Sequence, residues 1–227
     1  PPRSTLFPYT TLFRSMSESS SDKISEIISE ISRIYGADEW WEADSAEEVM
    51  IGAILTQQTR WENVRTAISR LKMHDLCSFP KIRSADPAFI EELIRPTGYY
   101  RQKTRRLKLL AEFVLERHGG MENLSNMETH LLRRELLSVN GVGEETADSI
   151  LAYGFMRDCI VIDRYTKRIF ACAGITSDGD ELRRAFEDAL PCTSSAKRGI
   201  HGHLVEYAKD FCNKSRCEEC VIRNLCE

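Results

Sequence analysis

The chain has 227 residues, of which 42% are hydrophobic and 29% charged, with a formal net charge of −4. This length suits one large domain or two small ones. No segment approaches the roughly 20 apolar residues that span a bilayer, so we expect no membrane association, and no signal peptide is recognisable. The net charge gives no indication of a nucleic-acid partner, although basic residues gather in two stretches, 60–83 and 95–108.

The N-terminal part of the chain falls into distinct segments. Residues 1–15 carry no acid and no helical period, and we expect a non-native leader followed by a natural start at Met16. The polar run 17–22 predicts a mobile tail. Isoleucines spaced three and four residues apart over 24–34 then predict an amphipathic helix.

Helix signals recur along the rest of the chain. Ser45 with Glu48 forms a capping box before a nearly all-apolar stretch, which predicts a central, buried helix. Asp86 followed by Pro87 predicts the start of another helix. Because no alternating run of strand length appears, the sequence predicts an all-α fold.

Four cysteines lie close together near the C-terminus, at Cys212, Cys217, Cys220 and Cys226. Four thiolates at such spacing suit a zinc ion or an iron–sulfur cluster, and the spacing alone does not separate the two. The remaining cysteines are scattered, which is typical of buried thiols in a reduced, intracellular protein.

A glycine pair separates two helical patterns. Gly141 and Gly143 bracket Val142 and permit a tight turn with outward-facing backbone N–H groups. The helix expected from Glu144 adds its own free N–H groups, and such an arrangement binds a phosphate. A purely structural turn is the alternative reading.

An aspartate follows the apolar run that ends at Ile162. Asp163 precedes a further helical pattern and is suited to capping it. A carboxylate at that position is also a candidate catalyst, and local sequence leaves both roles open.

In combination, these motifs resemble the endonuclease III superfamily of helix-hairpin-helix DNA glycosylases over residues 24–227. A glutamine-bearing helix end at 55–59, the hairpin at 139–143, Asp163 and the cysteine loop occur in the family's order. The resemblance implies a [4Fe–4S] cluster on the four cysteines and a catalytic Asp163. It also implies two helical domains, 16–37 with 158–227 and a six-helix domain over 38–157, with a DNA-binding cleft between them.

One position departs from the bifunctional members of that family. They carry a lysine two residues after the second hairpin glycine, where this chain has Glu145. A lysine amine can form a Schiff base with the sugar, and a carboxylate cannot. The sequence therefore predicts a monofunctional glycosylase that leaves an abasic site.

Trp40 with Trp41, the segment 53–64 and the segment 95–103 make the chain more similar still to the 3-methyladenine DNA glycosylase III branch. That resemblance implies that Trp40 or Trp41, together with Trp61, sandwiches the flipped base, where a cationic base gains from indole faces. Packing in the core is the alternative role for these tryptophans. The family also implies that Gln57 fills the hole left by the base, and that the DNA backbone contacts the hairpin at Asn140, Gly141, Val142 and Gly143.

We therefore expect a monomeric base-excision-repair enzyme that acts on damaged double-stranded DNA, with an alkylated base as substrate. The expected location is the cytoplasm, associated with the nucleoid. One alternative is an endonuclease III-type glycosylase and abasic-site lyase for oxidised or mismatched pyrimidines. A second alternative is a non-catalytic damage binder or a cluster-bearing electron carrier.

Overall fold

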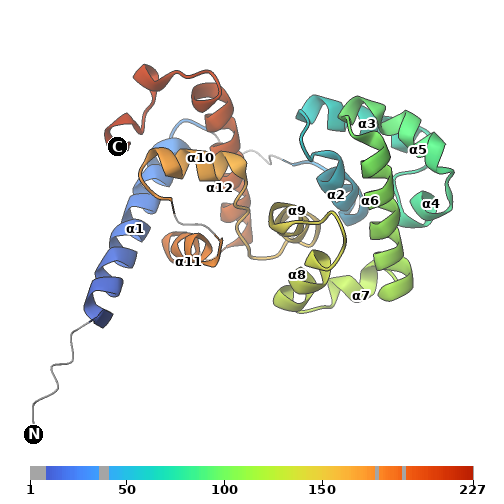
Figure 1. Ribbon diagram of the computed structural model, residues 1–227, viewed down its shortest axis with the longest axis horizontal. Coiled ribbons are helices and arrows are strands. Elements are labelled where there is room, and N and C mark those ends of the chain that lie inside the picture. The colour runs from blue at the N-terminus through green and yellow to red at the C-terminus, as the bar shows by residue number, and fades with distance from the viewer. Residues whose placement is uncertain (1–8, 36–40, 177–178, 191–192, 227) are drawn as a thin grey trace, which may run out of the picture. The chain divides into compact units, whose positions relative to one another are not determined.

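The computed structural model describes residues 9–35, 41–176, 179–190 and 193–226, and every regular element within those ranges is helical (Figure 1). The all-α fold expected from the sequence is confirmed. None of the described helices is long and apolar enough to cross a bilayer.

The chain divides into two compact units. One joins Pro1–Trp40 to Ile162–Glu227, and the other is the continuous segment Trp41–Val161. We call them the terminal unit and the central unit. Their bounds lie a few residues from those expected, and the cleft expected between the two domains stays a prediction.

The terminal unit combines the first helix of the chain with its last elements. The isoleucines from Ile24 to Ile31 are buried along α1, which packs against α11 and α12. Residues 17–22, expected as a polar tail, are helical and lie within α1, because extending a formed helix costs far less than nucleating one. The elements of this unit are α1 (Tyr9–Ser32), α10 (Arg164–Cys172), α11 (Gly179–Ala189), α12 (Ser194–Tyr207), η4 (Ala208–Cys212), η5 (Cys217–Glu219) and η6 (Arg223–Leu225).

The central unit contains eight α-helices where six were expected, and three of them, α4, α7 and α9, have only five or six residues. A single hydrophobic core joins its helices. Its elements are α2 (Ala46–Leu55), α3 (Trp61–Met73), α4 (Phe79–Ser84), α5 (Pro87–Ile94), η1 (Arg95–Thr97), α6 (Tyr100–Glu112), η2 (Phe113–Arg117), α7 (Met121–Ser125), α8 (Thr129–Leu137), α9 (Glu144–Ser149) and η3 (Ile150–Gly154).

Helix α2 lies at the centre of this core, as the sequence predicted. The Glu48 N–H donates to Ser45 Oγ at 3.1 Å, and the Glu48 carboxylate accepts from the Asp44 N–H. From Glu48 to Leu55 every residue of the helix is buried. Asp86 caps α5 in the predicted way, accepting from the Ala88 N–H at 2.7 Å.

A buried lysine satisfies the last carbonyl of α2. Lys103, on α6, is 1% exposed, and its Nζ donates to Leu55 O and Thr97 O at 2.8 Å each. Burial, with a smaller effect from the charge of Arg106, lowers the pKa of the Lys103 amine to about 8. This contact fixes the segments that follow α2 and η1 against one helix.

Candidate functional site

The predicted hairpin is present between α8 and α9. Gly141 has a φ of +94°, and a Cβ added there would lie 2.5 Å from Arg106 Nε, so both the backbone and its neighbour require glycine. Gly143 caps α9 with a φ of −93°, which any residue can adopt. A Cβ at Gly143 would meet open space. Nothing inside the protein therefore explains the missing side chain at Gly143.

The residues around this turn differ in their exposure. Asn140 and Glu145 are exposed, whereas Val142 is buried beneath the turn. Glu145 lies in the first turn of α9, whose dipole favours acidic side chains. Helix α9 continues directly into η3, so the hairpin leads into a longer helical segment.

Gln57 is joined to the hairpin. Its Nε2 donates to Gly141 O at 2.9 Å and to Thr146 Oγ1 at 3.1 Å, and its Oε1 accepts from Arg106 Nη1. Both ends of the amide are thus engaged within the central unit, whereas the next residue, Gln58, is exposed.

Four exposed side chains of the central unit stand on left-handed backbone, at Gln58, Asp75, Tyr99 and Met156. Gln58 has a φ of 55° and Tyr99 a φ of 46°, and Tyr99 is 63% exposed. Such conformations are uncommon outside glycine and carry a strain that often marks a functional position. Lys103 holds the segments on which both residues lie, through Leu55 O and Thr97 O. Sequence reasoning missed Gln58 and Tyr99, because nothing in the residue types indicates a positive φ.

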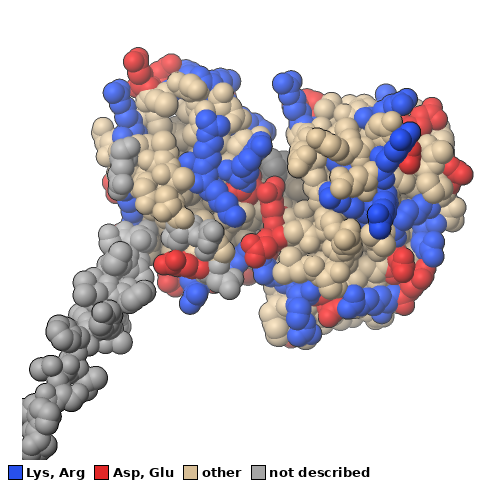
Figure 2. Space-filling view, viewed as in Figure 1, with Lys and Arg blue, Asp and Glu red and all other residues tan. Residues whose placement is uncertain are grey.

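Lysine and arginine side chains gather over the part of the central unit where α6 is drawn (Figures 1 and 2). Arg101 and Arg105 on this helix are exposed. The chain therefore has a local basic surface over α6, although its formal net charge is −4.

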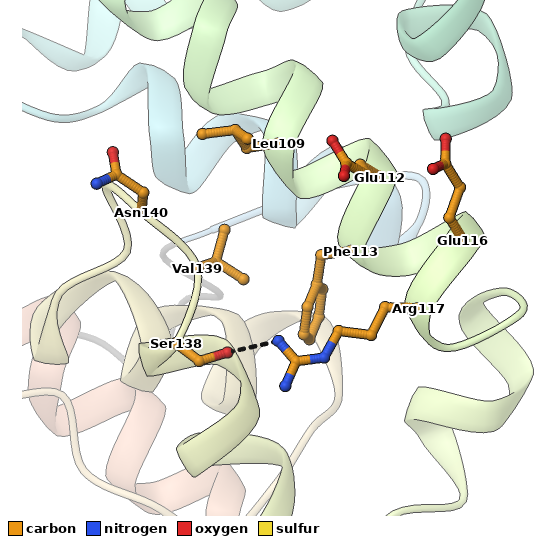
Figure 3. Close-up of a pocket in the computed structure, with 8 residues that line it drawn as sticks. All are labelled: Leu109, Glu112, Phe113, Glu116, Arg117, Ser138, Val139 and Asn140. Carbon is orange, nitrogen blue, oxygen red and sulfur yellow. Dashed lines mark hydrogen bonds between the residues drawn. The ribbon is translucent and has the colours of Figure 1, made fainter.

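A pocket of about 500 Å³ lies beside the hairpin, between the segment Ser138–Asn140 and the end of α6 with η2 (Figure 3). Arg117 Nη1 donates to Ser138 Oγ at 2.9 Å across it. Glu112 and Glu116 also line this pocket. Two carboxylates are unsuited to a DNA phosphate, so the exposed Gly143 end of the hairpin is the better candidate for anion binding.

Two of the predicted base-pocket tryptophans pack together. The rings of Trp41 and Trp61 meet edge to face with centroids 5.0 Å apart, and the ring of Tyr153 lies 5.4 Å from that of Trp41. Both tryptophans are half-buried against the core. Tyr153 joins this aromatic group without any sequence signal beyond its residue type. Trp40 lies outside the described residues.

Asp163 caps α10 and is buried. Its Oδ1 accepts from the Thr166 N–H at 2.7 Å and from the Thr166 hydroxyl at 2.8 Å. Its Oδ2 lies 3.6 Å from Nε2 of His201, a buried residue of α12. Burial opposes ionisation of the carboxyl, but the imidazole of His201 and the two donors of Thr166 outweigh it, so the pKa of Asp163 is lowered. His201 is far along the chain and had not been predicted.

The four predicted cysteine ligands lie in one region of the terminal unit. The thiol of Cys220 is 2.8 Å from the hydroxyl of buried Tyr207. Burial, aided by the thiols of Cys172, Cys220 and Cys212, raises the pKa of Cys226 to about 12. Burial also raises the pKa of Cys212, with further contributions from neighbouring cysteines. The thiolates would therefore repel one another unless a cation joined them.

The residue types of this loop suit a thiolate-bound metal group, but its described side chains are not arranged as a metal site. Four sulfur ligands on a short loop are the ligand type that zinc and iron–sulfur clusters take, and their mutual effects on pKa indicate that they share one region. Within the described part of the chain, no group of three or more histidine, cysteine or acidic side chains is arranged to hold an ion.

Comparisons with known proteins agree on one family. Residues 51–192 match the model of the HhH-GPD superfamily base excision DNA repair protein. The chain is 42% identical over 217 residues to MJ1434 of Methanocaldococcus jannaschii, assigned as a DNA repair glycosylase, covering 93% of this chain and 99% of that protein. Endonuclease III of Thermotoga maritima is 31% identical over 184 residues, covering 79% and 81% of the two chains.

Solved structures show the same architecture. The 3-methyladenine DNA glycosylase MagIII of H. pylori, bound to 1,N6-ethenoadenine, superposes with a TM-score of 0.72 at 29% identity, covering 84% of this chain and 97% of that one. A non-covalent endonuclease III–DNA complex superposes with a TM-score of 0.77 at 20% identity, covering 91% and 95%. The resemblance drawn from the sequence is confirmed, and the chain belongs to the HhH-GPD superfamily of base excision DNA repair proteins within the wider endonuclease III superfamily.

Proposed function

We propose that this protein is a monofunctional DNA N-glycosylase that acts as a monomer on damaged duplex DNA and releases an alkylated base by hydrolysis. The observation that carries this proposal is Asp163, a buried carboxylate kept ionised by His201 and Thr166. The base-excision-repair family and the names of the similar proteins support it.

Asp163 supplies the electrostatic part of the reaction in this proposal. Oδ1 is engaged in capping α10, which leaves Oδ2 beside His201 for the substrate. As the base departs with the bonding electrons, positive charge develops on the deoxyribose ring, and a fixed carboxylate stabilises it. Water then adds to the anomeric carbon, loses a proton and leaves an abasic site.

The hairpin holds the DNA backbone in this proposal. Gly143 leaves open space at the start of α9, where a phosphate can approach the backbone N–H groups and the positive end of the helix dipole. The expected contacts at Asn140, Gly141 and Val142 belong to the same turn. Gln58 and Tyr99, exposed on left-handed backbone, are candidates for contacting the opened duplex.

The lysine that would give lyase activity is replaced by Glu145, which lies exposed in the first turn of α9. A carboxylate cannot form a Schiff base with the abasic sugar. The second candidate function, an endonuclease III-type glycosylase and lyase, is favoured by the name of the Thermotoga maritima relative. Covalent trapping separates the two functions.

The aromatic group is the proposed base pocket. Trp41 and Trp61 are each half-buried at the edge of the core, and the ring of Tyr153 packs beside that of Trp41. A methylated purine such as 3-methyladenine carries a positive charge, and an indole face attracts such a cation by about 0.5–2 kcal/mol. This attraction would offset part of the cost of flipping the base.

We also propose that Cys212, Cys217, Cys220 and Cys226 hold a [4Fe–4S] cluster. Such a group would supply iron–thiolate bonds that fix the C-terminal loop, and it has no role in breaking the glycosidic bond. Arg168, which donates to Cys212 O at 2.7 Å, links the loop to α10, the helix that Asp163 caps.

Asp163→Asn should lose at least about 100-fold in single-turnover base release from a 3-methyladenine duplex, because the charge beside the sugar disappears. The helix cap should survive, since asparagine caps as well as aspartate. Asp86→Asn is the matched control at the exposed cap of α5 and should retain full activity. An unchanged rate for Asp163→Asn would contradict its catalytic role.

Wild-type protein should give no borohydride-trapped adduct with an abasic duplex, because the carboxylate of Glu145 cannot form a Schiff base. A trapped adduct would establish the lyase alternative.

Trp61→Leu keeps an apolar side chain but removes the indole face. Release of cationic 3-methyladenine should fall about 2- to 30-fold more than release of neutral 1,N6-ethenoadenine, because only the cation gains from the ring. Affinity for undamaged duplex should not change. The substrate proposal fails if both lesions lose activity equally, or if thymine glycol is released efficiently and 3-methyladenine is not.

The purified protein should be brown and contain about four iron atoms per chain, as a thiolate-bound [4Fe–4S] cluster requires. Cys217→Ser should lower the iron content, whereas Cys77→Ser, in the central unit, should leave it unchanged. Metal analysis together with the visible spectrum measures both. One zinc per chain without iron would contradict the cluster.

A further inference from the structure

We propose that Arg106 is a positioning residue that holds the hairpin through Gln57 and does not bind a DNA phosphate. This inference rests on the proposed function, because it assigns a role in DNA binding by the hairpin. It also gives Gln57 a role different from filling the hole left by a flipped base.

The contacts form a continuous connection between four segments of the central unit. Arg106, on α6, donates to Oε1 of Gln57, which follows α2. Nε2 of Gln57 donates in turn to the hairpin at Gly141 O and to α9 at Thr146 Oγ1. Because the amide uses both its acceptor and its donor, the guanidinium fixes which way the amide points.

The stem of Arg106 also contacts the turn directly. A Cβ on Gly141 would lie 2.5–2.6 Å from Nε, Cδ and Cγ of Arg106, so the side chain lies against the bare Cα of the left-handed glycine. Arg106 is half-buried, whereas the preceding residue, Arg105, is exposed. The two adjacent arginines of α6 therefore have different surroundings. Arg105 faces the solvent, whereas Arg106 packs against the hairpin.

The consequence is that the hairpin is ordered before DNA arrives. A turn that presents backbone N–H groups to a phosphate binds more tightly if those groups are already oriented, since ordering during binding costs conformational entropy. Phosphate contacts carry no sequence information, so the gain should apply to damaged and undamaged duplex alike.

The test compares full-length Arg106→Met, Gln57→Leu and Arg105→Met with wild type. Arg106→Met and Gln57→Leu should each weaken binding to an undamaged duplex about tenfold, the loss expected when a hydrogen bond to a charged group is removed. The slope of log affinity against log salt should not change. In the free proteins, amide hydrogen exchange at 139–143 should accelerate in both variants and stay at the wild-type rate in Arg105→Met.

A salt slope that falls by about 0.9 in Arg106→Met, with unchanged exchange at 139–143, would make Arg106 a phosphate ligand and overturn the inference. Wild-type exchange rates in Gln57→Leu would overturn it as well. Cooperative thermal unfolding of each variant checks that it is folded. The exchange measurement needs no DNA, so it tests the role of Arg106 even if wild-type protein binds no duplex, a result that would defeat the proposed function instead.

Discussion

The ammonium group of Lys103 is the contact on which the central unit depends. Helix α2, which is buried from Glu48 to Leu55, leaves carbonyl groups at its end that need partners inside the protein. Lys103 donates to the last of these, Leu55 O, and to Thr97 O at the end of η1. Because a buried charge is costly unless it is hydrogen-bonded, the two segments stay fixed to α6. The exposed residues Gln58 and Tyr99 follow directly from them.

The terminal unit presents a different constraint at Asp163. An asparagine would cap α10 as well as an aspartate does, so the helix does not require an ionised group that is only 7% exposed. The structure nevertheless keeps the carboxylate charged through His201 and Thr166. Burying the charge of Asp163 is costly, and the helix cap does not need it. A catalytic role would explain why the charge is kept, and the proposed function depends on this residue.

Local features could be predicted from the sequence, and long-range contacts could not. The nearly all-apolar pattern of α2 indicated its burial, and Gly141 and Gly143 indicated the turn. The partners Arg106 and Gln57 are 49 residues apart, and no local pattern signals their contact. His201 beside Asp163 was missed for the same reason. Helices α4 and α7, of six and five residues, are too short to show a helical period.

The most direct measurement is the titration of Lys103 by NMR of labelled lysine side chains, assigned with a Lys103→Arg variant. We predict a pKa of about 8 for the Lys103 amine, because the amine is buried and lies near Arg106. A pKa near the ordinary value of about 10.4 would mean that the amine is solvated. In that case the segments after α2 and η1 are not held as described, and the explanation of how exposed Gln58 and Tyr99 are positioned would be contradicted.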